Sequence, residues 1–300
     1  MTIARVAIVG LGLIGSSIAR AIKERLPQVA VTGHDAMSEV RDIARELDFC
    51  HAIVDDPVAA VADADLVILA VPVGRMADAA AAIASGLKAE AVISDVGSSK
   101  AGVAEALAKA LPRHVVIPAH PVAGTENSGP AAGFATLFEG RWCIVTPGAG
   151  APEGAVRAVT SFWQALGARV EMMDAAHHDM VLAVTSHLPH LIAYTIVGTA
   201  SELEEVTESE VIKYSAGGFR DFTRIAASDP VMWRDVFLAN KDAVLATLQR
   251  FNEDLTVLQQ AIRRGDADKL EDWFTRTRAI RRSIIEQGQD DAAPDFGRKH

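Results

Sequence analysis

Two side chains that could carry acid–base chemistry follow predicted strands in the first half of the chain. His120 comes after the apolar run 115–118, in a loop that Pro121 makes irregular. Ser98 lies in the loop 95–100, which follows another apolar run. Ligands of open parallel sheets bind at the carboxyl ends of the strands. We therefore expect His120, with an ordinary pKa of about 6.5, to serve as a base at neutral pH.

Both side chains also have a structural interpretation. A histidine can simply be hydrogen-bonded within the core, and taken alone that interpretation of His120 is as good as the catalytic one. Ser98 and Ser99 stand where a predicted helix begins. Because serine hydroxyls accept hydrogen bonds from the first N–H groups of a helix, we expect one of the two serines to be the cap.

The second half of the chain holds four closely spaced histidines: His177, His178, His187 and His190. The last two are three residues apart and so share a helix face, with Pro189 between them expected to kink the helix. Such spacing can hold zinc, but only Asp179 lies near as a further ligand. We expect the histidines to line a pocket as hydrogen-bond donors, and we expect no metal.

Two arginines could bind an anionic substrate. Arg220 and Arg224 lie in the segment 217–226, beside a glycine pair and between predicted helices. A guanidinium group binds a carboxylate through two parallel hydrogen bonds. Pairing with Asp221 or Asp229 is the alternative, so one arginine can be structural and the other functional.

The N-terminal run 6–15 carries the pattern Gly-x-Gly-x-x-Gly. It follows an apolar stretch typical of a buried strand and opens a predicted amphipathic helix over 14–26. Gly10 permits the tight turn, Gly12 lets the backbone approach a pyrophosphate, and Gly15 lets the helix pack closely on the strand. The sequence therefore predicts a dinucleotide-binding turn.

Neighbouring residues complete the predicted cofactor site. Leu13 and Ile14 supply N–H groups at the helix N-terminus, where phosphates bind. Val71 and Pro72 lie where the apolar strand 66–71 ends and are expected to border the cofactor. Asp35 lies 20 residues beyond Gly15, after a second apolar strand. An acid there hydrogen-bonds the ribose hydroxyls and repels a 2′-phosphate, which predicts NAD rather than NADP.

Alternating elements predict an α/β fold for residues 1–174, with a Rossmann-type, doubly wound, mostly parallel sheet. Beyond Asp174 nearly everything has helical periodicity, which predicts an all-α C-terminal domain over 175–286 and a disordered tail over 287–300. The elements expected after the first strand are strands at 29–32, near 53, and at 66–71, 91–95, 115–118, 141–146 and 170–172, and helices at 14–26, 39–47, 76–84, 100–110, 153–166, 175–200, 204–214, 230–262 and 267–286.

Composition narrows the class of protein. The chain has 300 residues, a net charge of −10 and 50% hydrophobic residues. The acidic balance disfavours nucleic acid as a partner, and no long uncharged apolar run predicts a membrane span. The first strand begins within a few residues, without room for a signal peptide, so we expect a cytoplasmic protein. Cys50 and Cys143 are expected to be buried free thiols, and broad apolar stripes on the helices predict a homodimer.

These motifs together resemble those of the prephenate/arogenate (cyclohexadienyl) dehydrogenases of tyrosine biosynthesis. The resemblance covers nearly the whole chain, and its most specific parts are DVGSSK at 95–100, HPVAGTE at 120–126 and SHLPH at 186–190. The resemblance implies an oxidative decarboxylation, in which hydride leaves ring carbon C4 for NAD⁺ and the ring carboxylate departs as CO₂. Nothing in the sequence decides between prephenate and arogenate.

The resemblance also implies roles for particular residues. His120 accepts a hydrogen bond or proton from the C4 hydroxyl, and Ser98 orients that histidine and the hydroxyl. Arg224 holds a substrate carboxylate. Further residues implied to contact or border the substrate are His187, His190, His178, Thr125, Glu126 and Trp233.

Two other functions remain open at this point. The first is an NAD-linked dehydrogenase of the β-hydroxyacid type, which would use a helix lysine such as Lys213 or Lys241 as its acid–base group. The second is a non-catalytic, dinucleotide-sensing regulator, which would keep the glycines but not the histidine, serine and arginine.

Overall fold

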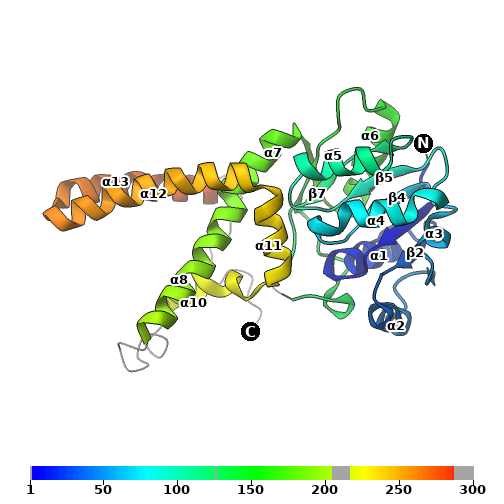
Figure 1. The fold of residues 1–300 in the computed structure, drawn as a ribbon, viewed down its shortest axis with the longest axis horizontal. Coiled ribbons are helices and arrows are strands. Elements are labelled where there is room, and N and C mark those ends of the chain that lie inside the picture. The colour runs from blue at the N-terminus through cyan, green and yellow to red at the C-terminus, as the bar shows by residue number, and fades with distance from the viewer. Residues whose placement is uncertain (1, 126, 205–216, 287–300) are drawn as a thin grey trace. The chain divides into compact units, whose positions relative to one another are not determined.

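The computed structural model describes residues 2–125, 127–204 and 217–286 (Figure 1). Strands and helices alternate as far as residue 172, and helices follow. The principal elements are β1 (Arg5–Val9), α1 (Leu13–Arg25), β2 (Ala30–His34), α2 (Ser38–Leu47), β3 (Ala52–Ile53), α3 (Pro57–Val61), β4 (Leu66–Leu69), α4 (Met76–Ile83), β5 (Val92–Asp95), α5 (Ala101–Ala110), β6 (Val115–Val116), β7 (Ala119–Pro121), β8 (Trp142–Val145), α6 (Glu153–Ala165), β9 (Arg169–Met172), α7 (Ala175–Leu182), α8 (Leu188–Glu204), α10 (Gly217–Thr223), α11 (Pro230–Ala239), α12 (Lys241–Arg264) and α13 (Ala267–Glu286).

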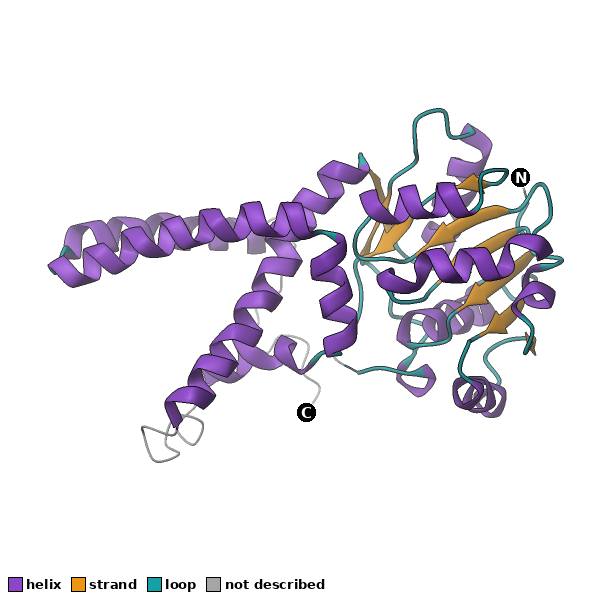
Figure 2. Cartoon of the chain, in the orientation of Figure 1, coloured by secondary structure: helices purple, strands orange, loops and turns teal. Residues whose placement is uncertain are grey.

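Six parallel strands form the main sheet, in the order β3-β2-β1-β4-β5-β6. Alternate residues of β1 point to opposite faces, as the pleat of a strand requires. Val6 and Ile8 pack with side chains of α1 and α6, whereas Ala7 and Val9 pack with those of α4 and α5. Helices therefore cover both faces of this sheet (Figure 2), which is the predicted doubly wound arrangement.

His120 lies in a second sheet that the sequence did not predict. This sheet has the order β7-β8-β9, with β7 antiparallel to β8 and β8 parallel to β9. The predicted strand 115–118 ends at Val116, and the chain joins the second sheet at Ala119. Pro118 lies at the break, which it helps to explain because proline has no N–H to donate to a strand ladder.

The predicted helix 175–200 is interrupted by a π-helical turn, Ala183–His187. Pro189 lies two residues beyond this turn, and because it has no N–H it cannot make the usual hydrogen bond to the carbonyl of Thr185. The predicted helix 230–262 divides at Asn240 into α11 and α12. The predicted helix 204–214, apart from its first residue, and the predicted tail 287–300 lie outside the described residues.

The chain separates into two compact units, of which one runs to Val244 and the other begins at Leu245, inside α12. The predicted boundary at Asp174 falls within the first unit and stays a prediction from the change of sequence pattern. In the second unit, α12 and α13 are joined at Gly265, whose φ of +66° is one that glycine adopts readily.

One stretch, Ala175–Leu203, is long and apolar enough to cross a bilayer by length and composition alone, and 28% of its most apolar window is buried. It contains His178, Asp179 and His187, which are all buried within the first unit. Core helices of globular proteins pass the same test, so this stretch carries no argument for a membrane span.

Candidate active site

The glycine-rich turn between β1 and α1 fits a dinucleotide. Gly10 has a φ of +98°, and a Cβ there would lie 2.4 Å from the carbonyl oxygen of Ala70. A Cβ on Gly15 would lie 1.9 Å from the carbonyl oxygen of Gly10, so the helix start packs directly on the turn. At Gly12 a Cβ would meet nothing within 4 Å. That space, beside the first N–H groups of α1, is what a pyrophosphate needs.

The other predicted cofactor residues lie around this turn. No side chain caps α1 at Gly12, and no acidic residue occupies its first turn, which leaves the half-buried Leu13 and Ile14 N–H groups for an anion. Asp35 directly follows β2, and its two carboxylate oxygens accept the N–H groups of Leu11 (2.8 Å) and Met37 (2.9 Å). Val71 and Pro72 follow β4, which pairs with β1.

A buried ion pair organises the loop between β5 and α5. Lys100 donates from Nζ to the carboxylate of Asp95 and, over 2.8 Å, to the carbonyl of Ala119, next to His120. Lys100 and Asp95 are both fully buried. Burial lowers the pKa of Lys100, and the charge of Asp95 opposes that shift.

Neither serine of this loop caps α5, contrary to the sequence-based expectation. The first N–H groups of the helix, at Lys100 and Ala101, donate instead to the two carboxylate oxygens of Asp179, over 2.7 and 2.9 Å. A carboxylate holds these groups better than a hydroxyl because it adds charge at the positive end of the helix. Ser98 is half-buried, and its side chain is left available for a ligand.

His120 is buried, and its ring contacts a second histidine. Its Nδ1 atom lies 2.9 Å from Nε2 of His178, with the two rings at 68°. The Nδ1 atom of His178 lies 2.8 Å from Oδ1 of Asp179. Three residues from two distant segments thus form a continuous hydrogen-bonded row: Asp179, His178 and His120.

Burial lowers the pKa of His120 well below 6.5, and the neighbouring His178, Lys100 and His187 lower it further. The sequence-based assumption of an ordinary pKa for His120 was therefore wrong. A low pKa keeps the imidazole uncharged and able to accept a proton over a wider pH range.

A hydrogen bond from Asn240 determines which ring nitrogen of His187 carries the proton. The amide nitrogen of Asn240 lies 3.0 Å from its Nδ1 and 2.7 Å from the carbonyl oxygen of Asp179, to which it donates. An amide N–H₂ group can only donate, so Nδ1 of His187 accepts and Nε2 carries the proton. Burial lowers the pKa of His187 to about 4.

The cluster continues from His187 to Arg224. Trp233 lies edge-on to His187 at 6.1 Å and stacks on His190 at 3.7 Å between ring centroids. Arg224 is exposed on the turn after α10, and its charge acts on His190, whose pKa is lowered chiefly by burial. The structure therefore connects the buried base His120 to the exposed Arg224 through two groups of rings, which Asp179 and Asn240 join by hydrogen bonds.

Several predicted residues are not brought into this cluster by any contact described. Thr125 is exposed, and its hydroxyl accepts the N–H of Asn127. Arg220, His177 and Lys241 are exposed, and Glu126 and Lys213 lie outside the described residues. Within the part of the chain that the structure describes, no group of three or more potential ligands is placed to hold a metal ion.

Sequence reasoning missed three buried polar residues of the site: Asp179, Asn240 and Lys100. Asp179 was noted only as a neighbour of possible metal ligands. Its acidic side chain beside a histidine inside an apolar helix is the signal that could have found it, because a buried charge requires partners. Asn240 stands where the predicted helix 230–262 divides.

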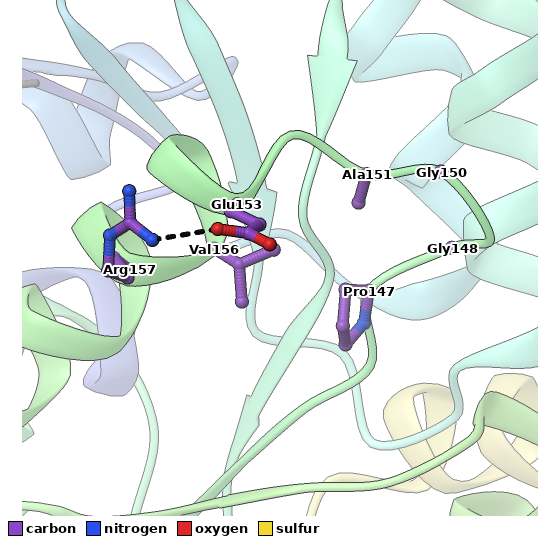
Figure 3. A pocket seen from close by; sticks show the side chains of 7 residues that line it. All are labelled: Pro147, Gly148, Gly150, Ala151, Glu153, Val156 and Arg157. Carbon is purple, nitrogen blue, oxygen red and sulfur yellow. Dashed lines mark hydrogen bonds and ion pairs between the residues drawn. The ribbon is translucent and has the colours of Figure 1, made fainter.

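A separate pocket lies at the start of α6 (Figure 3). Glu153 and Arg157, which line it, form an ion pair of 3.1 Å across one turn of the helix. Most of the remaining lining is small or apolar, for example Pro147 and Ala151. None of the residues of the histidine cluster lines this pocket, so it contributes nothing to the candidate active site.

A dinucleotide-binding α/β part that precedes helices bearing histidine and arginine side chains defines the class: an NAD-linked oxidoreductase with a helical second part. Two family models match the sequence. They are "Prephenate dehydrogenase, nucleotide-binding domain" over residues 18–172 and "Prephenate dehydrogenase, dimerization domain" over residues 174–276.

Individual relatives agree with this class. The chain is 46% identical to a cyclohexadienyl dehydrogenase of Zymomonas mobilis, over 93% of this chain and 95% of the relative. It is 35% identical to a prephenate dehydrogenase of Bacillus subtilis, over 97% of this chain and 78% of the relative. The structure superimposes on Aquifex aeolicus prephenate dehydrogenase, solved with hydroxyphenyl propionate and NAD⁺, with a TM-score of 0.89 at 33% identity, covering 95% and 99% of the two chains. The chain belongs to the prephenate dehydrogenase family.

Proposed function

We propose that this protein catalyses the NAD-dependent oxidative decarboxylation of prephenate, of arogenate or of both, in tyrosine biosynthesis. The observation that carries the proposal is the continuous cluster from the uncharged base His120 to the guanidinium group of Arg224. The reaction needs both residues: a base must take the proton of a hydroxyl, and a cation must hold the carboxylated side chain in place.

The residues of the chain divide the work as follows. Arg224 binds a carboxylate of the substrate, and His187 presents an N–H donor to it. His120 accepts the C4 hydroxyl proton while the hydride leaves C4 and the ring carboxylate departs as CO₂, its bonding electrons entering the ring. The proton then returns from His120 to the ring oxygen of the new phenol. When bound, the nicotinamide accepts the hydride.

The cofactor choice rests on Asp35 at the end of β2. Its carboxylate would hydrogen-bond the ribose hydroxyls and repel a 2′-phosphate. Replacing Asp35 with serine is expected to raise the ratio of kcat/KM with NADP to that with NAD at least tenfold. Like-charge contacts cost several kcal/mol, and 1.4 kcal/mol corresponds to tenfold. An unchanged ratio would remove Asp35 from cofactor selection.

The decisive assay follows reduction of the cofactor with prephenate and with arogenate, each with NAD and with NADP. Turnover that releases CO₂ with either substrate supports the proposal. In the His120→Asn variant we expect kcat to fall by about 10²–10⁴-fold, the usual effect of losing a positioned base. Absence of turnover with both substrates, in a protein that binds NAD, would overturn the assignment.

A further inference from the structure

The carboxylate of Asp179 has two roles, because it caps the start of α5 and also accepts a hydrogen bond from His178. Both of its oxygens accept N–H groups at the start of α5, and Oδ1 also accepts from the imidazole of His178. These three hydrogen bonds favour the ionised carboxylate and lower its pKa against the opposing effect of burial. Asp179 is therefore a fixed acceptor at the end of the row that leads to His120.

This row of hydrogen bonds determines which ring nitrogen of each histidine carries the proton. A carboxylate can only accept, so Nδ1 of His178 carries a proton, and in the uncharged ring Nε2 presents a lone pair. His120 must then donate from Nδ1, 2.9 Å away. The remaining nitrogen of His120, Nε2, is left as a lone pair, which is the form that can take a hydroxyl proton.

We propose that His178, anchored by Asp179, is a positioning residue that holds His120 in the tautomer with a bare Nε2 atom. The inference rests on the proposed function for its kinetic consequence, but the tautomer itself belongs to the ligand-free protein. A histidine without such a partner distributes its proton between both nitrogens, and the wrong tautomer can cost about 10⁴-fold in kcat in enzymes that depend on it.

The other charged and titratable groups near His120 do not supply this hydrogen bond. Lys100 is held by Asp95 and by the carbonyl of Ala119, and His187 is held through its Nδ1 by Asn240. Both lower the pKa of His120, but neither makes a hydrogen bond to its ring among those of the described residues. Only His178 contacts Nδ1 of His120 among the hydrogen bonds of the described residues.

The test replaces His178, because a change at Asp179 would also uncap α5. Leucine removes the acceptor, whereas glutamine can accept from His120 with its carbonyl oxygen and donate to Asp179 with its amide. His177→Leu makes the same chemical change on the preceding, exposed residue of α7 and serves as the matched control. We expect kcat to fall about 10²–10⁴-fold in His178→Leu, with little change in KM, and to stay close to the parent value in His178→Gln and His177→Leu.

A second readout needs no turnover. Nitrogen-15 correlation spectra, with His120 assigned by comparison with His120→Asn, report which ring nitrogen carries the proton. We expect protonated Nδ1 and bare Nε2 in the parent and in His178→Gln, and a mixture or the reverse in His178→Leu. If leucine prevents folding, the parent and His178→Gln spectra still decide.

The outcomes separate the two proposals. A protonated Nε2 on His120 in the parent overturns the inference, as does an unchanged tautomer or an unchanged kcat in a folded His178→Leu protein. Absence of turnover in the parent, together with the expected tautomer, overturns the proposed substrates and leaves the tautomer assignment standing.

Discussion

Burial keeps three histidines of the site uncharged. The pKa values of His120 and His190 are lowered, and that of His187 is lowered to about 4. In the unfolded chain each returns to about 6.5, so the unfolded state binds more protons between the two values. The histidines therefore stabilise the fold fully above pH 6.5, and this contribution is lost as the pH falls below it.

Chemical denaturation between pH 7.5 and 5 should show this loss. Each buried histidine contributes a slope of at most about 1.4 kcal/mol per pH unit in the free energy of unfolding. In a His187→Gln variant the slope should be smaller than in the parent, whereas His177→Gln, at an exposed position, should leave it unchanged. A free energy of unfolding that is flat over this range would contradict the low pKa values.

Arg224 is the residue to which we assign the substrate carboxylate. Replacing it with glutamine should raise KM by about 10–150-fold, because a hydrogen bond to a charged group contributes about 1.5–3 kcal/mol. Arg220→Gln, at an exposed position on α10, is the matched control and should leave KM near the parent value. The opposite result, with KM raised only at Arg220, would move the carboxylate to that residue.

At the scale of elements, two glycines of the turn between β1 and α1 have different roles: Gly15 is needed for folding, and Gly12 for cofactor binding. In Gly15→Ala the added methyl group would lie 1.9 Å from a backbone oxygen, so α1 must shift. We expect a loss of about 1–3 kcal/mol or more in stability, seen as a lower Tm, together with loss of NAD binding.

Gly12→Ala is the partner experiment. The methyl group meets nothing in the protein, and the residue has a φ of −68°, which alanine adopts freely. Tm should stay near the parent value while the Kd for NAD rises, because the methyl group occupies the space left for the pyrophosphate. If Gly12→Ala binds NAD as the parent does, the pyrophosphate lies elsewhere.

The elements that the sequence predicts well are those with local causes. Strand β4 is a continuous apolar run buried on both faces, and the structure places it at Leu66–Leu69 against a predicted 66–71. Strands β1 and β5 are also mostly apolar and buried. The glycine-rich turn and the acid after β2 also follow from local spacing. The fold class and the conformation of this turn were therefore predictable, and the cofactor residues around it stay a prediction.

The elements that the sequence did not predict depend on residues far away along the chain. Strand β7 has only three residues and exists because β8 pairs with it. The cap of α5 comes from Asp179, 79 residues beyond Lys100. No local pattern contains such contacts, so a serine beside the helix start was predicted to do what a distant carboxylate does.

At the scale of the whole molecule, we propose a homodimer, in keeping with the match to a family dimerization domain. The second compact unit exposes large apolar side chains along α12 and α13: Leu245, Leu255, Ile262, Phe274 and Ile280. Apolar surface of this extent marks an interface. Sedimentation should give about twice 31.8 kDa.

Charged substitutions test that surface. The double variant Leu255→Glu and Ile262→Glu should sediment as a monomer, because it places carboxylates in the buried part of the interface. Ile43→Glu, at another exposed apolar position, on α2, should leave the dimer intact. A monomeric parent, or a dimer that survives the double change, would contradict the assignment.

The cytoplasmic location stays a prediction.

The π-helical turn Ala183–His187 sets the direction in which His187 points relative to His178. On an unbroken α-helix, nine residues would set His178 and His187 about 180° apart around the axis. With the wider turn between them, Asn240 reaches the carbonyl of Asp179 and the ring of His187 at once. Deleting one residue there would restore a regular α-helix, and the wider turn on which the ring of His187 reaches Asn240 would be lost.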